Sequence, residues 1–270
     1  MANSDRQIRV AVAGALGKMG REVVKTVMAD PAFQLVAAID PSSVGQDIGS
    51  LIGTEEAGVF VANSLAEALL QSSAEVLIDF TTPNVVTQNV YIALEYGVRP
   101  VVGTTGIKQE DLQAWDRILK EKQIGGVVAP NFAIGAILMM KFSAMAAKYM
   151  PHVEIIELHH DQKLDAPSGT AVKTAEMIAK ERARMQQGHP AEEEKLQGAR
   201  GADFEGMKIH SVRLPGYVAH QEVLFGGVGQ TLVIRHDSIS RESFMPGVAL
   251  AAKKVTGITG LVYGLENLID

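Results

Sequence analysis

Cysteine is absent from the 270 residues of this chain. Without a thiol, the chain can form no disulfide scaffold, no thiolate metal site and no iron–sulfur cluster, and it has no cysteine nucleophile. Any chemistry that it performs must therefore use other side chains or a bound cofactor.

Excess positive charge and long apolar runs are also missing. Lysine and arginine number 25 against 31 acidic residues, giving a net charge of -6, so no overall positive field attracts nucleic acid. The longest nearly apolar run, 132–140, is far shorter than the ~20 residues of a membrane-spanning helix. Residues 1–7 are polar and do not resemble a signal peptide. We expect a soluble cytoplasmic protein with no nucleic-acid or membrane partner.

The composition is that of an ordinary globular protein, with 47% hydrophobic and 21% charged residues. Its length suits roughly two domains of ~100–200 residues each. A change of pattern along the chain would mark the boundary between two such domains.

The first 130 residues alternate apolar, strand-like runs with helix-compatible segments. The predicted strands are 8–13, 33–39, 76–80, 101–102 and 127–128, and the predicted helices are 21–28, 64–71, 83–96 and 109–123. Apolar strands separated by helices are typical of βαβ units, in which helices cover both faces of a parallel sheet. The sequence predicts an α/β, Rossmann-like first domain.

The pattern changes after about residue 131. The predicted elements are a helix over 132–148, a strand over 153–160, a helix over 170–185, a polar loop over 186–206, strands over 209–214, 218–225 and 231–236, and a terminal helix with a tail over 244–269. Short turns between the later strands favour antiparallel pairing. We predict a second, α+β domain at 131–240, with a mainly antiparallel or mixed four-stranded sheet.

A glycine turn lies between the first strand and the first helix. It has G-x-x-G-x-x-G spacing, ending at Gly20, and its candidate cofactor-binding residues are Gly14, Ala15, Leu16, Gly17, Lys18 and Met19. Backbone N–H groups at such a helix N-terminus can hold a pyrophosphate. The spacing alone is a weak signal, but Asp40 ends the second strand 20 residues after Gly20, where a Rossmann fold places the ribose-binding carboxylate. The alternative is a merely tight turn between strand and helix.

The Asp40 segment also bears on the choice of cofactor. Asp40 is followed by Pro41, Ser42 and Ser43, with no lysine or arginine. A carboxylate accepts a hydrogen bond from a ribose 2′-hydroxyl but repels a 2′-phosphate. We therefore expect NADH to be preferred over NADPH, although Lys18 is a cation that could reach a phosphate.

Three further strand ends carry polar or glycine-rich turns, at 80–83, 103–106 and 129–132. In an open α/β sheet, ligands bind outside the carboxyl ends of the strands. The candidate cofactor-binding residues here are Gly103, Thr104, Thr105, Ala129, Pro130, Asn131 and Phe132.

The densest polar cluster, residues 157–170, begins at a strand end and contains His159, His160 and Lys163. It runs into a predicted helix whose N-cap is Ser168 and whose first N–H groups belong to Gly169 and Thr170. A loop with histidine and lysine that enters a helix N-terminus suits an acidic small molecule. The histidines, Asp161 and Asp165 could instead hold a metal, but adjacent histidines on a strand diverge, so we expect no metal.

These motifs resemble the dihydrodipicolinate reductase family, also called 4-hydroxy-tetrahydrodipicolinate reductase, of the diaminopimelate and lysine pathway. The similarity runs from Val10 to the C-terminal helix and includes the glycine turn, the turns at 103–105 and 129–132, and above all the segment 157–170. The resemblance implies reduction of a cyclic dicarboxylate by NADH or NADPH.

The resemblance also implies roles for individual residues. His159 would be the proton donor or acceptor and Lys163 a second proton donor, and the residues that hold the substrate carboxylates would be His160, Gly169 and Thr170. The family often has a basic residue where this chain has Pro41, which places NADPH preference in doubt. Arg241 and Phe244 would approach the nicotinamide.

At the level of whole domains, the resemblance implies that segment 241–270 rejoins a cofactor domain formed by 1–130, and that the protein is a homotetramer. Two other functions fit the same motifs: an NAD-dependent dehydrogenase of another small acid, and a non-catalytic regulator that senses NADH. A substrate panel would separate the first from the reductase, and cofactor binding without turnover would indicate the second.

Overall fold

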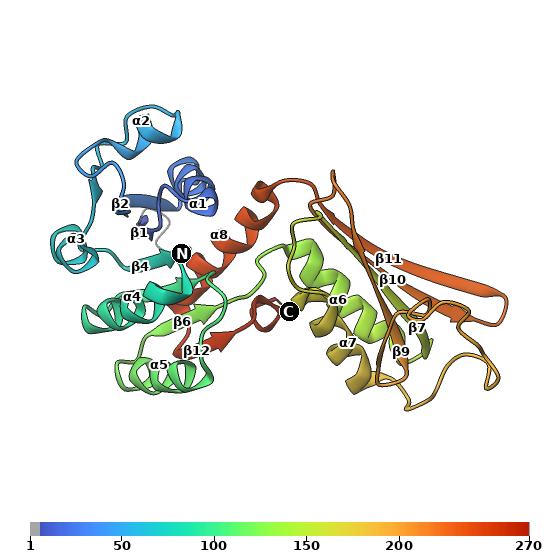
Figure 1. Ribbon diagram of the computed structural model, residues 1–270. Coiled ribbons are helices and arrows are strands. Elements are labelled where there is room, and N and C mark those ends of the chain that lie inside the picture. Colours follow the sequence, from blue (N-terminus) through green and yellow to red (C-terminus); the bar gives the residue numbers. More distant parts are fainter. Residues whose placement is uncertain (1–5, 270) are drawn as a thin grey trace. The chain divides into compact units, whose positions relative to one another are not determined.

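The computed structural model describes residues 6–269, which divide into two compact units (Figure 1). The first unit contains residues 6–132 together with 244–269, and the second contains 133–243. The chain therefore leaves the first unit once and returns to it. The short 3-10 helix η1 (Arg241–Phe244) spans the point of return.

The first unit is built on a seven-stranded parallel sheet. Its strands are β1 (Ile8–Ala13), β2 (Phe33–Ile39), β3 (Val61–Ala62), β4 (Val76–Asp79), β5 (Arg99–Val102), β6 (Gly125–Val128) and β12 (Gly260–Tyr263). They lie in the order β12-β6-β5-β4-β1-β2-β3, and every pair is parallel. β4 and β6 are buried throughout, as expected of parallel strands covered on both faces.

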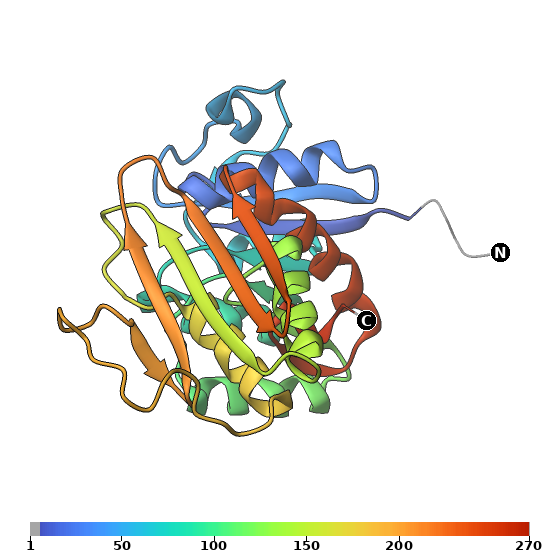
Figure 2. The ribbon, with the colours of Figure 1, turned by 90° about the vertical axis from the view of Figure 1, so that its right-hand side faces the viewer.

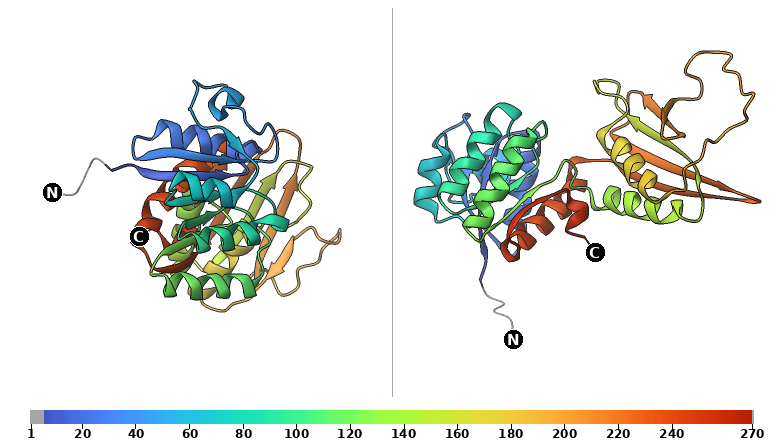
Figure 3. Two further views of the ribbon diagram at one scale, coloured as in Figure 1. Left: turned by 90° about the vertical axis from the view of Figure 1, so that its left-hand side faces the viewer. Right: turned by 90° about the horizontal axis from the view of Figure 1, so that it is seen from below.

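Helices connect these strands and provide most of the core. They are α1 (Lys18–Ala29), α2 (Ile48–Ile52), α3 (Leu65–Ser72), α4 (Pro83–Glu95), α5 (Gln109–Glu121) and α8 (Met245–Lys254), with 3-10 turns η2 (Val255–Gly257) and η3 (Leu265–Asn267). α4 and α5 lie side by side over one face, and α1 contacts α8 (Figures 1 and 3). Trp115 on α5 is fully buried among apolar side chains of α4 and of the strands below. The predicted Rossmann-like architecture is confirmed.

The C-terminal segment contains more than the predicted helix and tail. After α8 the chain forms β12, which pairs in parallel with β6 and completes the edge of the sheet. The N–H of Leu261 donates to the side chain of Asp116 on α5 at 2.9 Å, which fixes the new strand to the neighbouring helix. β12 follows directly on the 3-10 turn η2, within the 244–269 segment that was predicted as a helix and tail.

The second unit has a five-stranded mixed sheet, not the predicted four-stranded one. Its strands are β7 (His152–His159), β8 (Ala202–Phe204), β9 (Met207–Arg213), β10 (Ala219–Gly227) and β11 (Gln230–Ser238), in the order β11-β10-β7-β9-β8. β7 and β9 are parallel, and the other pairs are antiparallel. The additional strand, β8, lies in the polar segment predicted as a loop. Its three residues are too few and too exposed to show an apolar pattern.

Two helices, α6 (Ile134–Ala147) and α7 (Gly169–Glu181), pack together on one face of this sheet. Figure 2 looks onto the opposite face, with both helices behind the strands. Val223 and Phe225 of β10 are buried on the helix side, because residues two apart in a strand share a face. Between residues 6 and 269, no helix has the length and apolar character needed to cross a membrane.

Candidate active site

The predicted cofactor residues lie where the parallel strands end. Gly14 follows β1, Asp40 follows β2, Gly103 follows β5 and Ala129 follows β6, so all four are at the carboxyl edge of one sheet. Strand order reverses at β1, which lies between β4 and β2. Such a switch point is where an open α/β sheet forms its ligand-binding crevice.

The glycine turn is packed so tightly that side chains are excluded from it. A Cβ at Gly20 would lie 1.9 Å from the carbonyl oxygen of Gly14, and Gly14 itself has a positive φ of 74°. Gly17 is the N-cap of α1 and provides no side chain to cap the helix. The first turn of α1 contains no acidic residue either. Its backbone N–H groups therefore suit a pyrophosphate, which is the group that a dinucleotide would place here.

Asp40 joins the ends of β1 and β2. It is 8% exposed, and its two carboxylate oxygens accept hydrogen bonds from the N–H of Leu16 at 3.0 Å and of Ser42 at 2.9 Å. Each oxygen has a second lone pair, so the carboxylate retains capacity for a ribose hydroxyl. The neighbouring Pro41 is exposed and uncharged.

A buried carboxylate that sequence reasoning missed organises the next strand ends. Asp79, the last residue of β4, is fully buried and accepts from the hydroxyl of Thr81 at 2.6 Å, the amide of Asn89 at 2.8 Å and the hydroxyl of Thr104 at 3.3 Å. Burial raises the pKa of Asp79 above its ordinary value. The signal in the sequence was a single acidic residue that ends an otherwise apolar strand.

The turn after β6 combines exposed and buried residues. The Phe132 side chain is 2% exposed, and its ring packs 5.7 Å from that of Phe80. Its backbone carbonyl packs against Gly247 of α8, where a Cβ would lie only 1.9 Å away. Phe132 is thus a core residue by its side chain, while Pro130 lies on the surface.

The second unit brings His159 together with two residues that the sequence did not identify as functional. The Nδ1 of His159 lies 2.5 Å from Oε2 of Glu157, on the same strand. Arg213 on β9 pairs with both oxygens of Glu157, at 2.7 and 2.8 Å. Although burial opposes ionisation, hydrogen bonds from His159, Arg213 and Ser211 lower the pKa of Glu157 to about 2. Glu157 could have been noticed in the sequence as an acidic residue within a largely apolar strand. No feature of the sequence marks Arg213.

The loop after β7 carries the other predicted catalytic residue. The ammonium of Lys163 contacts Oδ1 of Asp165 at 2.7 Å, and this ion pair lowers the pKa of Asp165. The backbone N–H of Lys163 donates to the carbonyl of His160, which turns the loop back on itself. Arg213 donates to the carbonyl of Asp165, so the cation that pairs with Glu157 also fixes this loop.

The loop leads directly into α7. Ser168 is buried and caps the helix, because its hydroxyl accepts from the N–H of Ala171 at 3.2 Å. The N–H of Ser168 donates to Oε1 of Glu157, which fixes the helix N-terminus beside the His159 cluster. Gly169 faces open space. Histidine, lysine and a helix N-terminus thus converge around one loop, an arrangement suited to binding carboxylates and transferring protons.

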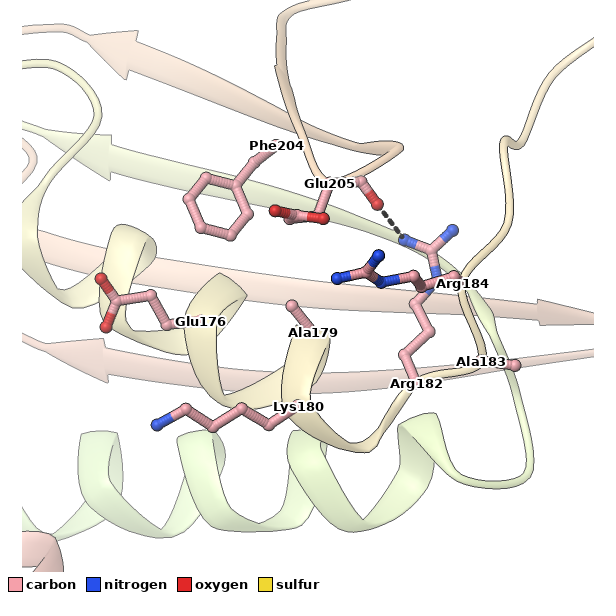
Figure 4. Close-up of a pocket in the computed structure, with 8 residues that line it drawn as sticks. All are labelled: Glu176, Ala179, Lys180, Arg182, Ala183, Arg184, Phe204 and Glu205. Carbon is pink, nitrogen blue, oxygen red and sulfur yellow. Dashed lines mark hydrogen bonds between the residues drawn. The ribbon is translucent and has the colours of Figure 1, made fainter.

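Groups of three or more histidine, aspartate or glutamate side chains placed to hold a metal ion are not found within residues 6–269. A pocket lies at the other end of α7, about 20 Å along the helix from Gly169 at 1.5 Å per residue. Figure 4 shows the guanidinium of Arg182 at this pocket, where it donates a hydrogen bond to the backbone carbonyl of Glu205. Arg182 also donates to the carbonyls of Met185 and Gly206, so it fixes the turn between β8 and β9.

Two family models cover almost the whole chain. The model described as "Dihydrodipicolinate reductase, N-terminus" matches residues 8–132, and that described as "Dihydrodipicolinate reductase, C-terminus" matches 135–269. The chain belongs to the dihydrodipicolinate reductase family. Among its relatives in this family is the 4-hydroxy-tetrahydrodipicolinate reductase of Halalkalibacterium halodurans, which is 60% identical over 263 residues, 97% of this chain and 100% of that protein. The reductase of Geobacillus kaustophilus is 54% identical and covers 97% of this chain.

Solved structures place the family's fold in a wider group. The structure described as dipicolinate-bound dihydrodipicolinate reductase from Paenisporosarcina sp. TG-14 has 51% identity and a TM-score of 0.88, and the match covers 98% of this chain and 100% of that one. An amine dehydrogenase from Mycobacterium smegmatis has a TM-score of 0.70 at 16% identity, so that likeness concerns the fold alone.

Proposed function

We propose that this protein catalyses the NADH- or NADPH-dependent reduction of 4-hydroxy-tetrahydrodipicolinate to tetrahydrodipicolinate, a step of diaminopimelate and lysine biosynthesis. The observation that carries the proposal is the convergence of His159, Lys163 and the α7 N-terminus on one loop, in a chain that also has a dinucleotide-type glycine turn. Relatives at 53–60% identity are named for this reaction.

The reaction adds one hydride and one proton to the substrate ring and releases water. The nicotinamide supplies the hydride when bound. The protein's task is to hold the two carboxylates and supply the proton, which we assign to His159 with Lys163 as the second donor. His160, Gly169 and Thr170 would receive the carboxylates near the α7 N-terminus. The dipicolinate-bound reductase from Paenisporosarcina sp. TG-14 supports a ring dicarboxylate as the ligand.

The cofactor would bind at the carboxyl edge of the first unit. We assign the pyrophosphate to the glycine turn, Gly14 to Met19, and the adenosine ribose to Asp40, with the turns at 103–105 and 129–132 towards the nicotinamide. Asp40 and the uncharged Pro41 support a preference for NADH, since a 2′-phosphate would meet a carboxylate and the turn that follows it, 41–43, has no lysine or arginine.

We also propose that the protein is a homotetramer formed through the face of the second sheet that α6 and α7 leave uncovered. Leu224 lies on this face beside Val233, which is half exposed. Apolar side chains in this position favour contact with another subunit over contact with water.

The test of function is the loss of reduced-nicotinamide absorbance, with NADH and NADPH in parallel and the substrate generated from pyruvate and aspartate semialdehyde by the preceding synthase. We expect rapid, synthase-dependent oxidation, faster with NADH at limiting concentration. Demonstrated NADH binding without oxidation would contradict the proposal and favour another substrate or a sensing role.

A further inference from the structure

Glu157 is the most completely enclosed acidic group of the second unit's candidate site. Its side chain has no exposed surface, and its carboxylate accepts from both terminal nitrogens of Arg213 and from the N–H of Ser168. It is also in contact with the side chain of Ser211 on β9 and with Nδ1 of His159, the latter at 2.5 Å. The carboxylate thus faces donors from β7, β9 and the start of α7.

These contacts determine which nitrogen of His159 carries a proton. The guanidinium of Arg213 and the N–H of Ser168 can only donate, so the Glu157 carboxylate that they contact is ionised and can only accept hydrogen bonds. A close contact with Nδ1 then requires that Nδ1 is the protonated nitrogen. Nε2 is left as the nitrogen that gains and loses a proton.

Resting on the function proposed above, we propose that Glu157 is a positioning residue that fixes the ring orientation and tautomer of His159, so that Nε2 is the atom that exchanges a proton with the substrate. Arg213 contributes to the same positioning of His159. Its guanidinium compensates the negative charge of the buried carboxylate. Its hydrogen bond to the carbonyl of Asp165 also fixes the loop that carries Lys163 relative to His159.

Positioning of His159 requires both the Glu157 carboxylate and the Arg213 guanidinium in their charged forms. An unpaired buried carboxylate is strongly unfavourable, and a carboxylate that became protonated would no longer demand a proton on Nδ1. The bidentate Arg213 contact keeps Glu157 ionised while leaving Oε2 able to accept from the imidazole. The pair therefore does more than hold β7 to β9: it sets the protonation pattern of the neighbouring ring.

The deciding experiment reads the tautomer directly. Protein labelled with ¹⁵N in its seven histidines is observed by NMR without ligand, and the His159 signals are identified by their loss in His159→Gln. We expect Nδ1–H and an unprotonated Nε2 in the neutral ring of the wild type. In Glu157→Gln, whose amide can accept or donate, we expect a mixture of tautomers.

Turnover provides a second readout. General acid–base groups typically contribute 10²–10⁴-fold, so a loss of ring positioning in Glu157→Gln should lower kcat by at least about tenfold. NADH affinity, a property of the first unit, should stay within about twofold. Glu176→Gln, an exposed glutamate of α7, is the matched control and should retain wild-type kcat.

An Nε2–H tautomer in the wild type, or an unchanged kcat in a folded Glu157→Gln, would overturn the inference. The tautomer measured by NMR in the wild type tests the inference even if Glu157→Gln fails to fold. Wild-type protein that oxidises neither cofactor would overturn the proposed reductase function instead, and the tautomer measurement, which needs no turnover, separates the two failures.

Discussion

His159 and Lys163 are held in very different ways, although both belong to the same short segment. His159 contacts a fully buried carboxylate, whereas Lys163 pairs with Asp165, whose side chain is 61% exposed. Exposed ion pairs of this kind contribute only about 0–1 kcal/mol. Lys163 can therefore leave Asp165 for an acidic ligand at a small cost in free energy, while the imidazole of His159 stays bound to Glu157.

This difference leads to a prediction for Lys163→Ala. We expect kcat to fall by about 10²-fold or more, because the residue that we propose as the second proton donor is lost. NADH affinity should change by less than about twofold, because the glycine turn lies in the other unit. Steady-state kinetics and fluorescence titration with NADH measure both, and Lys180→Ala, an exposed lysine on α7, is the control. Wild-type turnover in Lys163→Ala would remove this residue from the mechanism.

We also expect cofactor preference to depend on single residues. Pro41 is exposed beside Asp40, so Pro41→Arg adds a cation where a 2′-phosphate would meet the carboxylate. We expect kcat/KM with NADPH to rise roughly tenfold, equivalent to about 1.4 kcal/mol, with little change for NADH. Pro41→Ala separates the effect of the added charge from the loss of proline. An equal rise in both variants, or none in Pro41→Arg, would contradict the assignment of the ribose to Asp40.

At the scale of elements, the contact between the glycine turn and α1 leaves no room for a methyl group. A Cβ at Gly20 would lie 1.9 Å from the Gly14 carbonyl oxygen, whereas a Cβ at Gly257 has no heavy atom within 4 Å. We expect Gly20→Ala to lose about 1–3 kcal/mol of unfolding free energy through overpacking and to bind NADH at least tenfold more weakly. Gly257→Ala should match the wild type in urea unfolding and NADH titration. Equal NADH affinity in the two variants would contradict a role for this turn in binding.

The long elements were predictable because their side chains carry a pattern that tertiary structure preserves. β1 and α7 have apolar residues at the spacing of a buried strand and of an amphipathic helix, and both formed close to the predicted positions. The missed strands β3, β8 and β12 have two to four residues each. β3 and β8 each pair with a seven-residue strand, and β12 pairs with the four-residue β6. All three become strands where a neighbour offers hydrogen-bonding groups, and the sequence does not record which neighbour that is.

The residues of the candidate site likewise include some that the sequence predicts and some that it does not. Gly14 and Asp40 could be found because a local motif and a fixed spacing mark them. The contact between Arg213 and Glu157 joins residues 56 apart, through the parallel pairing of β7 with β9. No local pattern encodes that register. Asp79 was missed for a related reason: besides the adjacent Thr81, its donors are Asn89 on α4 and Thr104 after β5, which approach it only in the folded unit.

At the scale of the whole molecule, the chain forms two compact units that each have buried apolar residues of their own. The chain leaves the first unit near Phe132 and returns at η1, so β12 completes the first sheet although it follows the whole second unit in the sequence. Family models cover both units, in the same order. The glycine turn and the His159 cluster are therefore built by independent packing, which is why we expect their variants to affect cofactor binding and proton transfer separately.

The assembly of several copies is the last property that the fold allows us to predict. Val223 and Phe225 are buried towards the helices, so Leu224 and its partner Val233 lie on the opposite face, where Val233 is 51% exposed. We expect light scattering to give a mass about four times 28.9 kDa for the wild type. Val233→Asp should shift the protein to smaller species, because a carboxylate buried between subunits loses its hydration. Val44→Asp, at an equally exposed valine of the first unit, should remain tetrameric. A monomeric wild type, or a Val233→Asp variant that assembles normally, would show that this face serves another purpose.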